Sequence, residues 1–314
     1  MALALKSPLE PQLARSRPEL PVGEQWSYEP KYDGFRAIVF VDGDGCMIQS
    51  RTGKPLGRYF PELSFPPGRY VLDGEIVIDG DDGGQDFDAL QNRIHPALSR
   101  ITMLASETPA RYVAFDVLAL GDESLLSRPF EDRRQALESD VPGPIDLTPV
   151  TRERAEAEPW LQSGEGVVAK DIHAEYRPGQ RTGMVKVKRV RTIDAVVVGY
   201  RPGKADGTVG SLILGLYDDA GKLHVVGHSS GISAPEKRAL VNKLAPYETG
   251  NRGHGDPSRW KSEKDLEWIE LRPELVVEVT FDHVSGGRIR HGTKILRWRE
   301  DKPPMECKLA QMSL

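Results

Sequence analysis

The sequence predicts an α+β protein with two domains, in which antiparallel strands predominate. Its 314 residues are 39 % hydrophobic and 28 % charged, which is an ordinary globular composition and enough chain to bury two cores. Segments in which apolar and polar residues alternate recur along the chain, separated by Gly, Pro and Asp. Beyond residue 190 these segments become shorter and more closely spaced. We therefore place one domain at residues 1–190 and a second at residues 191–314.

The first domain is expected to combine strands with two helices. Strand patterns occur, in chain order, at "FRAIVFVDG", "YVLDGEIVI", "RYVAFDVLAL", "GEGVVAK" and "GMVKVKR". Helical patterns occur at "FDALQNRI" and "SRPFEDRRQALES", where Ser127 is a candidate N-cap ahead of Glu131. Together they predict a mixed domain built on antiparallel sheets.

The second domain shows short strands around a single helix. The strand patterns are "DAVVVGY", "SLILGLYDD" and "KLHVVGHS", then "ELVVEVTFDHV" and "ILRWRE" after a helical "APEKRALVNKLAPY". This order suits a small oligonucleotide-binding β-barrel, and other small β folds fit it as well.

Composition excludes several classes of protein. Only Cys46 and Cys307 are present, which excludes a disulfide scaffold and a four-cysteine zinc site, so a metal would bind oxygen atoms. The first 20 residues lack the apolar core of a secretion signal, and no run is long enough to span a membrane, so we expect a cytoplasmic protein. The net charge is -5, but residues 191–314 hold 19 Lys and Arg against 17 Asp and Glu. This part is the candidate side for a polyanion, although a solvated charged face would have the same composition.

Lys31 is the first candidate functional residue. It stands in "YEPKYDGFRA", before the turn signal Asp33-Gly34 and the strand that follows, so we expect it in a loop between paired strands. A solvated lysine has a pKa near ~10.4, so its free amine, the form that attacks phosphorus or carbonyl carbon, is rare at neutral pH. Nearby cations or burial would favour that form. A lone Lys-x-Asp-Gly is nevertheless weak evidence.

The segment "MVKVKRV" supplies candidate cations. Side chains alternate along a strand, so Val185 and Val187 should face the core while Lys186 and Lys188 face the opposite side together. Two lysines on one strand face suit a phosphate, and an ordinary solvated basic face is the alternative.

Two carboxylates interrupt apolar strands. Glu75 lies in "YVLDGEIVI" and Glu165 in "GEGVVAK", where a buried charge is costly unless it is paired or bound to a cation. Both are candidate ligands of Mg²⁺ or Mn²⁺, and a salt bridge to a lysine explains each equally well. Arg51, after "CMIQS", could donate to a ribose hydroxyl or a phosphate, or lie on the surface. Phe115, in "YVAFDVLAL", could stack on a base or pack in the core.

Taken in order, these segments resemble the motifs of the covalent nucleotidyltransferase superfamily, and most closely the compact bacterial ATP-dependent DNA ligases of the ligase C type. The matching segments are "KYDGFR", "SRTGK", "DGEIV", "YVAFDVL", "EGVVAK", "VKVK" and "RWREDK". The resemblance covers almost the whole chain. It implies a nucleotidyltransferase (adenylation) domain over residues 1–190 and an OB-fold β-barrel over residues 191–314. A tryptophan common in the family is replaced by Met184, which affects packing more than chemistry.

The resemblance also implies the reaction. Lys31 would attack the α-phosphate of ATP, expel pyrophosphate and form a lysyl-AMP, with Mg²⁺ or Mn²⁺ as cofactor. AMP would then pass to a DNA 5′-phosphate, and the neighbouring 3′-hydroxyl would displace AMP and seal the nick. Phosphoryl transfer of this kind asks mainly for positioning and neutralisation of charge.

Several residues would hold the nucleotide, by the same resemblance. Glu29 would read the adenine amine, Phe115 would stack on the ring and Arg51 would hold the ribose. Lys186 and Lys188 would contact the α-phosphate through all three steps.

A second set would position the reacting groups. Asp33 and Arg36 would place the metal-bound water and the nick phosphate. Arg299, Asp301 and Lys302 resemble the residues that orient the leaving pyrophosphate, which requires the barrel to close over ATP and then swing away to admit DNA.

The expected partner is nicked duplex DNA in the bacterial nucleoid. The chain has no counterpart of the helical DNA-binding domain of large ligases, nor of the polymerase and nuclease domains of ligase D. Its grip on DNA should therefore be sensitive to salt, and repair polymerases or end-binding proteins are the candidate protein partners.

Three rival functions share part of this pattern. An RNA ligase or an mRNA-capping guanylyltransferase shares the lysine, carboxylates and lysine pair, but "EPK" and "RWREDK" look like DNA ligases. An NAD-dependent ligase needs a cysteine zinc module that two cysteines cannot build. A non-catalytic nucleic-acid-binding module should have lost catalytic positions, whereas all of them are present here.

Overall fold

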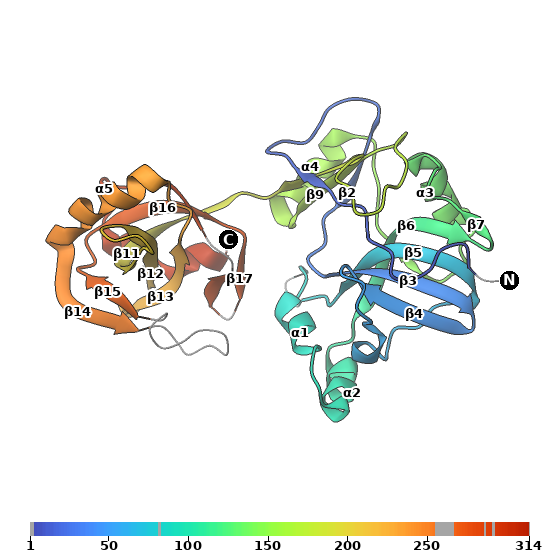
Figure 1. Ribbon diagram of the computed structural model, residues 1–314, viewed down its shortest axis with the longest axis horizontal. Coiled ribbons are helices and arrows are strands. Elements are labelled where there is room, and N and C mark those ends of the chain that lie inside the picture. The colour runs from blue at the N-terminus through green and yellow to red at the C-terminus, as the bar shows by residue number, and fades with distance from the viewer. Residues whose placement is uncertain (1–2, 81–82, 255–266, 286, 291–292, 314) are drawn as a thin grey trace. The chain divides into compact units, whose positions relative to one another are not determined.

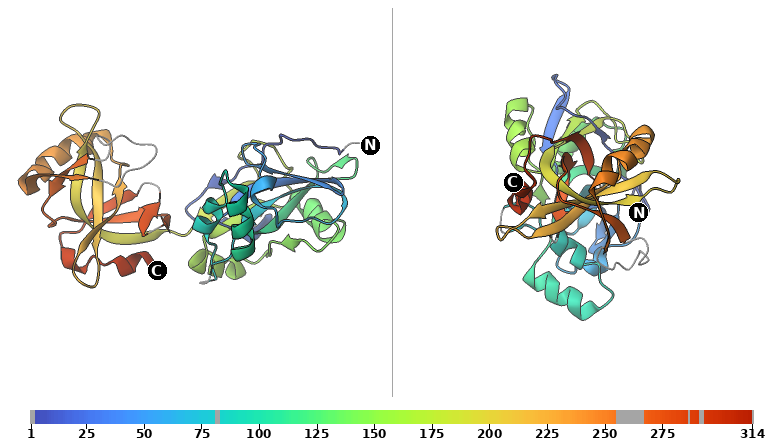
Figure 2. Two further views of the ribbon diagram at one scale, coloured as in Figure 1. Left: turned by 90° about the horizontal axis from the view of Figure 1, so that it is seen from below. Right: turned by 90° about the vertical axis from the view of Figure 1, so that its left-hand side faces the viewer.

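The computed structural model describes residues 3–80, 83–254, 267–285, 287–290 and 293–313. The chain forms two compact units, Met1–Arg189 and Val190–Leu314, and passes between them once (Figures 1 and 2). The mixed helix and sheet composition, with mainly antiparallel sheets, confirms the predicted fold class.

Two sheets make up the first unit. The four-stranded sheet has the order β1 (Arg15–Ser16), β10 (Met184–Lys188), β9 (Gly166–Asp171) and β2 (Trp26–Pro30). The six-stranded sheet has the order β4 (Gly45–Ser50), β3 (Phe35–Gly43), β5 (Gly68–Val77), β6 (Arg111–Leu120) and β7 (Glu123–Ser124), with β8 (Asp146–Leu147) parallel to β6.

The four-stranded sheet has one apolar and one polar face. Strand alternation turns Tyr28, Val167 and Val187 to the same side, where they pack with α4 (Arg154–Ser163) in a small hydrophobic core. In the register of β9, Val168 pairs with Lys186 on one neighbour and with Glu29 on the other, so these side chains share the opposite face. The apolar side holds the sheet in the unit, and the other side is left for polar groups.

The six-stranded sheet is buried on both faces, because a second hydrophobic cluster lies on the side away from the main core. Alternate residues of β3 and β5, including Val39 and Leu72, enter the main core of the unit. On the other face Arg36 pairs with Glu75, and Ile38 pairs with Asp73. One end of this face is therefore strongly charged, although it lies in the interior of the unit.

The connection that contains Lys31 differs from the prediction. The strands on either side of it, β2 and β3, belong to different sheets and do not pair with each other, so Lys31 lies on a crossover and not in a hairpin loop. Gly34 permits this crossover because a Cβ atom there would lie 2.2 Å from the carbonyl oxygen of Ile76. The turn signal at Asp33-Gly34 therefore reflects close backbone approach and not a tight turn between paired strands.

Helices cover the outer surfaces of the first unit. They are α1 (Phe87–Asn92), α2 (Leu98–Glu107), α3 (Phe130–Ser139) and α4. The sequence patterns identified α1 and α3, and α3 packs beside β6 (Figure 1). The predicted cap of α3 was wrong, because its N-cap is Pro129 and makes no side-chain hydrogen bond. The patterns also missed α2 and α4, the latter interrupted by Pro159.

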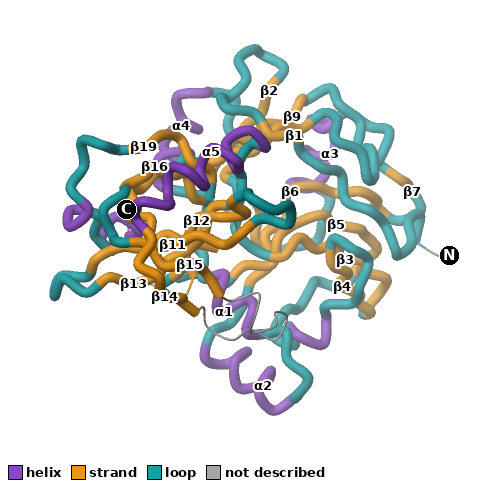
Figure 3. The backbone as a smooth tube through the Cα atoms, turned by 60° about the vertical axis from the view of Figure 1, so that its left-hand side comes forward, coloured by secondary structure: helices purple, strands orange, loops and turns teal. Residues whose placement is uncertain are grey.

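The second unit is mainly antiparallel sheet. Its strands are β11 (Arg191–Pro202), β12 (Val209–Tyr217), β13 (Leu223–Ser229), β14 (Glu248–His254), β15 (Glu267–Leu271), β16 (Val276–Phe281), β17 (His283–Ser285), β18 (Arg288–Arg290) and β19 (Lys294–Trp298). The single α-helix of the described part, α5 (Ala234–Leu244), begins in a capping box at Ser233 and packs against β12 (Figure 3). Short 3₁₀ turns lie at Ala245–Tyr247, Pro304–Glu306 and Leu309–Ser313 in this unit and at Gly57–Tyr59 in the first unit.

Long strand β11 organises this unit. It pairs with β16 along its first half, with β15 along its second half, and with β12 on its other edge. Among the described residues the pairings run from β13 through β12, β11 and β16 to β19 with a branch to β15 and β14, so the sheet is open and does not form a closed barrel. The prediction missed β14 and β15, which carry few alternating apolar residues.

Candidate active site

A pocket of ≈ 200 Å³ lies in the first unit, where the two sheets face each other. Its walls come from β2, β9 and β10 on one side and from β3, β5 and β6 on the other, with the segment at residues 11–14 at its rim. The lining contains seven of the residues singled out in the sequence: Glu29, Lys31, Arg36, Arg51, Glu75, Phe115 and Lys186. Residues spread over more than 150 positions of sequence are thus brought to one cavity.

Lys31 is held at the seam between the sheets. Its backbone N–H donates to the carbonyl of Gly166 at 2.9 Å, which ties the crossover to the start of β9. Gly166 has φ of +131°, and a Cβ atom there would lie 2.2 Å from the carbonyl oxygen of Val187. The side-chain Nζ of Lys31 is half-buried and donates to the carbonyl of Tyr32 at 3.1 Å. Among the described residues, the amine therefore has one hydrogen-bond partner, a neutral carbonyl at the pocket wall.

Cations surround one end of the pocket. Burial lowers the pKa of Lys186, and the charges of Lys188, Lys31, Arg51 and Arg181 lower it further. These cations repel one another in the empty pocket. An anion that enters the pocket is therefore attracted by all of them. Sequence reasoning missed Arg181, which lines the pocket from an irregular segment.

Glu75 introduces the opposite charge into the same cavity. Burial raises the pKa of its carboxyl group to about 7, and the nearby charges of Arg36 and Lys31 offset this only in part. A carboxylate that is so poorly compensated is available to a cation. The described part of the chain contains no group of three or more His, Cys, Asp or Glu side chains arranged to hold a metal ion.

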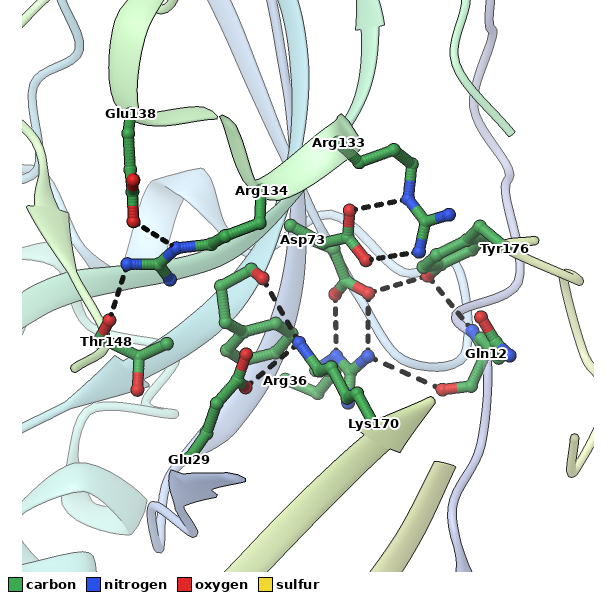
Figure 4. A network of polar contacts seen from close by, with 12 residues as sticks. Gln12, Glu29, Arg36, Asp73, Arg133, Arg134, Glu138, Thr148, Lys170 and Tyr176 are labelled. Atoms are coloured by element: carbon green, nitrogen blue, oxygen red, sulfur yellow. Dashed lines mark hydrogen bonds and ion pairs between the residues drawn. The ribbon is translucent and has the colours of Figure 1, made fainter. Parts of the chain in front are cut away.

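Glu29 is buried and only half satisfied. Its side chain is 3 % exposed, and its Oε2 accepts from the Nζ of Lys170 at 2.9 Å (Figure 4). The other oxygen, Oε1, is buried without a hydrogen-bond partner, although the residue lines the pocket. A buried acceptor without a partner is costly, so this oxygen is suited to a donor on a bound molecule.

Arg36 is fixed by a buried network that the sequence did not reveal. Its guanidinium donates to both carboxylate oxygens of Asp73 at 2.6 Å, and Asp73 has no exposed surface (Figure 4). Tyr176 donates its hydroxyl to the same carboxylate at 2.6 Å and accepts from the backbone N–H of Gln12 at 3.0 Å. Burial alone would lower the pKa of Arg36, but Asp73 more than offsets this and raises it. Arg36 therefore remains a cation with a fixed orientation.

The ring of Phe115 contacts two cations. The guanidinium of Arg36 lies 4.5 Å and the ammonium of Lys170 lies 4.7 Å from the centre of its ring. The side chain lines the pocket although the residue is 8 % exposed. The ring therefore packs in the core and also presents a small surface to the cavity. Core packing and stacking on a base, the two roles considered from the sequence, are compatible for this residue.

Three predicted residues of the first unit do not line the pocket. Asp33 lies on the crossover after Lys31, and Lys188 ends β10 on the same strand face as Lys186. Glu165 directly precedes β9, next to the Gly166 carbonyl that holds Lys31, and its side chain is half-buried. All three lie close in sequence to pocket residues.

The remaining predicted residues lie in the second unit. Arg299 donates to Asp194 at 2.9 Å and to both carboxylate oxygens of Asp301 at 2.9 and 2.8 Å. These hydrogen bonds lower the pKa of Asp301 to about 2. Lys302 contacts Glu306 at 3.1 Å, and this hydrogen bond raises the pKa of Lys302. Each of these residues is therefore charged and has a partner within its own unit.

Comparison with known proteins is consistent along the whole chain. Residues 11–188 match the family described as "ATP dependent DNA ligase domain", and residues 205–302 match "ATP dependent DNA ligase C terminal region". The chain is 45 % identical to DNA ligase C1 of Mycolicibacterium smegmatis, over 99 % of this chain and 96 % of the relative. It is 43 % identical to DNA ligase C of Mycobacterium tuberculosis, with the same coverage of both chains.

Solved structures give the same picture. A mycobacterial DNA ligase D complexed with ATP and MES superposes with a TM-score of 0.53 at 28 % identity, over 95 % of this chain and 97 % of the other. A Lig E DNA ligase shares the fold with a TM-score of 0.59 at 20 % identity, over 92 % of this chain and 99 % of the other. No helix in the described ranges has the length and apolar character required to cross a membrane.

Proposed function

Since the chain belongs to the ATP-dependent DNA ligase family, we propose that Lys31 is the residue that carries AMP from ATP to DNA. The observation that supports this assignment is the pocket itself, which places the Lys31 amine beside a group of cations and beside the unpartnered oxygen of Glu29. A cavity that combines an unpartnered carboxylate oxygen with many cations suits a nucleotide whose base donates a hydrogen bond and whose phosphates are anionic.

The pocket residues would bind ATP by complementary chemistry. Glu29 Oε1 would accept from the adenine amine, and the exposed part of the Phe115 ring would contact the base. Arg51 would donate to the ribose hydroxyls, and Lys186 to the α-phosphate, with Lys188 next to it on the same strand face. These contacts would hold the α-phosphorus at the Lys31 amine.

In the first step the nitrogen of Lys31 would form a bond to the α-phosphorus while the bond to the pyrophosphate oxygen breaks. The amine must lose its proton to react, and the cations around it would stabilise the charge that develops on the phosphate oxygens. The AMP group then moves to the 5′-phosphate at a nick, and the 3′-hydroxyl displaces AMP. Arg36, oriented by Asp73, would contact the nick phosphate, and Asp33 would orient a water at the metal.

A divalent metal ion, Mg²⁺ or Mn²⁺, fits the acidic group of the pocket. Glu75 would hold it, because its carboxylate lines the cavity and lacks full compensation, and Glu165 is the second candidate ligand. The ion would supply additional neutralisation of phosphate charge.

We assign the second unit the role of an OB domain that completes the site for the first step. Arg299, Asp301 and Lys302 would orient the pyrophosphate. Arg299 and Lys302 would have to exchange their present contacts with Asp194 and Glu306 for the phosphate oxygens. The unit would then move away to admit DNA.

The proposed substrate is a nick in duplex DNA, and the proposed setting is repair at the bacterial nucleoid in the cytoplasm. Relatives at 30 % identity carry the name "Multifunctional non-homologous end joining DNA repair protein LigD", and this chain spans 37 % of their length. Polymerase and end-processing functions would come from separate partner proteins, which we propose to be repair polymerases or end-binding proteins.

The test is to follow label from α-labelled ATP or GTP, with Mg²⁺, onto the protein and then onto nicked DNA or RNA duplexes. We expect label from ATP on wild type and on the exposed control Lys6→Ala, transfer to nicked DNA, and no label on Lys31→Ala. Labelling of Lys31→Ala would refute the assignment of the nucleophile. Labelling from GTP, or transfer only to RNA, would favour a capping enzyme or an RNA ligase.

A further inference from the structure

Lys170 is a buried cation in the wall of the nucleotide pocket, and none of the chemical steps above uses it. Its side chain is 4 % exposed. The ammonium donates to Glu29 Oε2 at 2.9 Å (Figure 4). It also donates to the backbone carbonyl of Phe115 at 3.1 Å. It also lies 4.6 Å from the centre of the Phe130 ring. Lys170 thus joins the four-stranded sheet to the six-stranded sheet behind the pocket.

The strand register explains this position. In the pairing of β2 with β9, Glu29 lies opposite Val168 and Ser27 lies opposite Lys170. Glu29 and Lys170 are therefore diagonal neighbours on the same face, a separation of about 7–8 Å between α-carbons that a long side chain can span. The ammonium reaches one carboxylate oxygen from the side, and the other oxygen is left for the cavity.

The charge of Glu29 depends on this contact. Burial raises the pKa of the Glu29 carboxyl group, and Lys170 is the largest influence that lowers it. Arg134 also lowers that pKa, but its guanidinium is hydrogen bonded to Glu138 and to the carbonyl of Thr148. Without Lys170, a carboxylate that is 3 % exposed would lose its only direct ion pair in the described structure and would tend to bind a proton.

We propose that Lys170 is a positioning residue that sets nucleobase selectivity, by keeping Glu29 an ionised acceptor with Oε1 turned to the base. An ionised carboxylate has no proton to donate, so it accepts from a 6-amino purine and faces the oxygen of a 6-oxo purine as a second acceptor. A protonated or rotated Glu29 could donate to that oxygen and would lose this discrimination. The inference deepens the proposed function, because it rests on Glu29 as the residue that reads the base.

The experiment compares the kcat/KM of self-labelling of the full chain with ATP and with inosine triphosphate, which carries a 6-oxo group. Wild type should prefer ATP. Lys170→Met should reduce the ratio of kcat/KM for ATP to that for inosine triphosphate by about tenfold or more, which is the effect expected from loss of one buried polar contact. Lys170→Arg should keep most of the preference, because it keeps the charge. Lys170→Gln is the second neutral variant if the methionine prevents folding.

Arg93→Met is the matched control. Arg93 is also a buried cation, 0 % exposed, and its guanidinium lies 5.1 Å from the centre of the Phe60 ring, but its carboxylate partner is Glu62 and not Glu29. It should lose stability without a change in the nucleotide ratio. An equal change of the ratio in both variants would mean that Lys170 acts through general packing, and would overturn the inference.

Glu29→Ala distinguishes an error in the proposed base recognition by Glu29 from an error in the proposed role of Lys170. If Glu29→Ala keeps the wild-type ratio, the proposed reading of the base by Glu29 is wrong. If Glu29→Ala abolishes the preference but both neutral Lys170 variants retain it, only the role of Lys170 is wrong. In the Glu29→Ala background, Lys170→Met should change the ratio no further, which is the coupling expected of two residues that act as one unit.

Discussion

Replacing Glu75 by glutamine should stabilise the protein above neutral pH and have a much smaller effect in acid. Burial raises the pKa of Glu75 from an ordinary value of 4.5 to about 7 in the folded chain. Between these two values the folded state binds more protons than the unfolded state, so the free energy of unfolding falls as pH rises. Above pH 7 the carboxylate is charged in both states, and the folded protein bears the full cost of its burial.

The magnitude follows from the two pKa values. A carboxyl group that titrates at 4.5 unfolded and at about 7 folded lowers the free energy of unfolding by about 3 kcal/mol at pH 8 and by about 1 kcal/mol at pH 5. Glutamine has no charge to bury, so Glu75→Gln removes the destabilisation that burial of the carboxylate causes. The stability of the variant minus that of wild type should therefore grow by roughly 2–3 kcal/mol from pH 5 to pH 8.

Urea denaturation of the full chain at both pH values is the assay. Subtracting the stability difference at pH 5 from that at pH 8 cancels any effect of the amide that does not depend on pH. Glu19→Gln, at an exposed position, controls for the loss of a carboxylate. A difference that stays constant or shrinks from pH 5 to pH 8 would refute the argument that burial controls this group. The same variant should also lose most self-adenylation, because the proposed metal ligand is gone.

Two further predictions concern the contacts of the proposed site. Lys302→Ala should slow self-adenylation with ATP and leave sealing of pre-adenylated nicked DNA within roughly twofold of wild type; an equal loss in both assays contradicts a role in orienting pyrophosphate. Asp73→Asn should cost about 3 kcal/mol of unfolding free energy in urea, because it breaks the buried pair with Arg36. Tyr176→Phe, which removes one hydroxyl from the same network, should cost only about 1 kcal/mol; equal costs would show that the ion pair is not the dominant contact.

Alternation along the strands predicted much of this fold. The patterns "FRAIVFVDG" and "RYVAFDVLAL" coincide with β3 and β6 as the structure has them, because apolar residues dominate both strands and both strands are buried over most of their length. The local sequence of a strand does not indicate which other strands it pairs with. The crossover at Lys31 looked like a hairpin loop because the turn signal is local, whereas the pairing of β2 with β9 joins segments more than 130 positions apart.

In the candidate site, too, some residues had a local sequence signal and others did not. Residues such as Glu75 and Lys186 stood out because a charge interrupts an apolar strand. Lys170 lies in a similar strand and could have been found by the same signal, since its charge follows "GVVA". Arg181 had no such signal, because it lies in an irregular segment and reaches the pocket only through the tertiary fold.

The single passage of the chain between its units, at the 71 % exposed Val190, has a consequence for how the two halves encounter each other. A short tether turns their meeting into an intramolecular event, with an effective concentration on the order of millimolar. Two separate polypeptides, cut at this point, would have to reach that concentration in solution to meet as often. In the proposed mechanism, where the second unit completes the site for the first step, the covalent joint would contribute to that step by lowering the entropic cost of bringing the two units together.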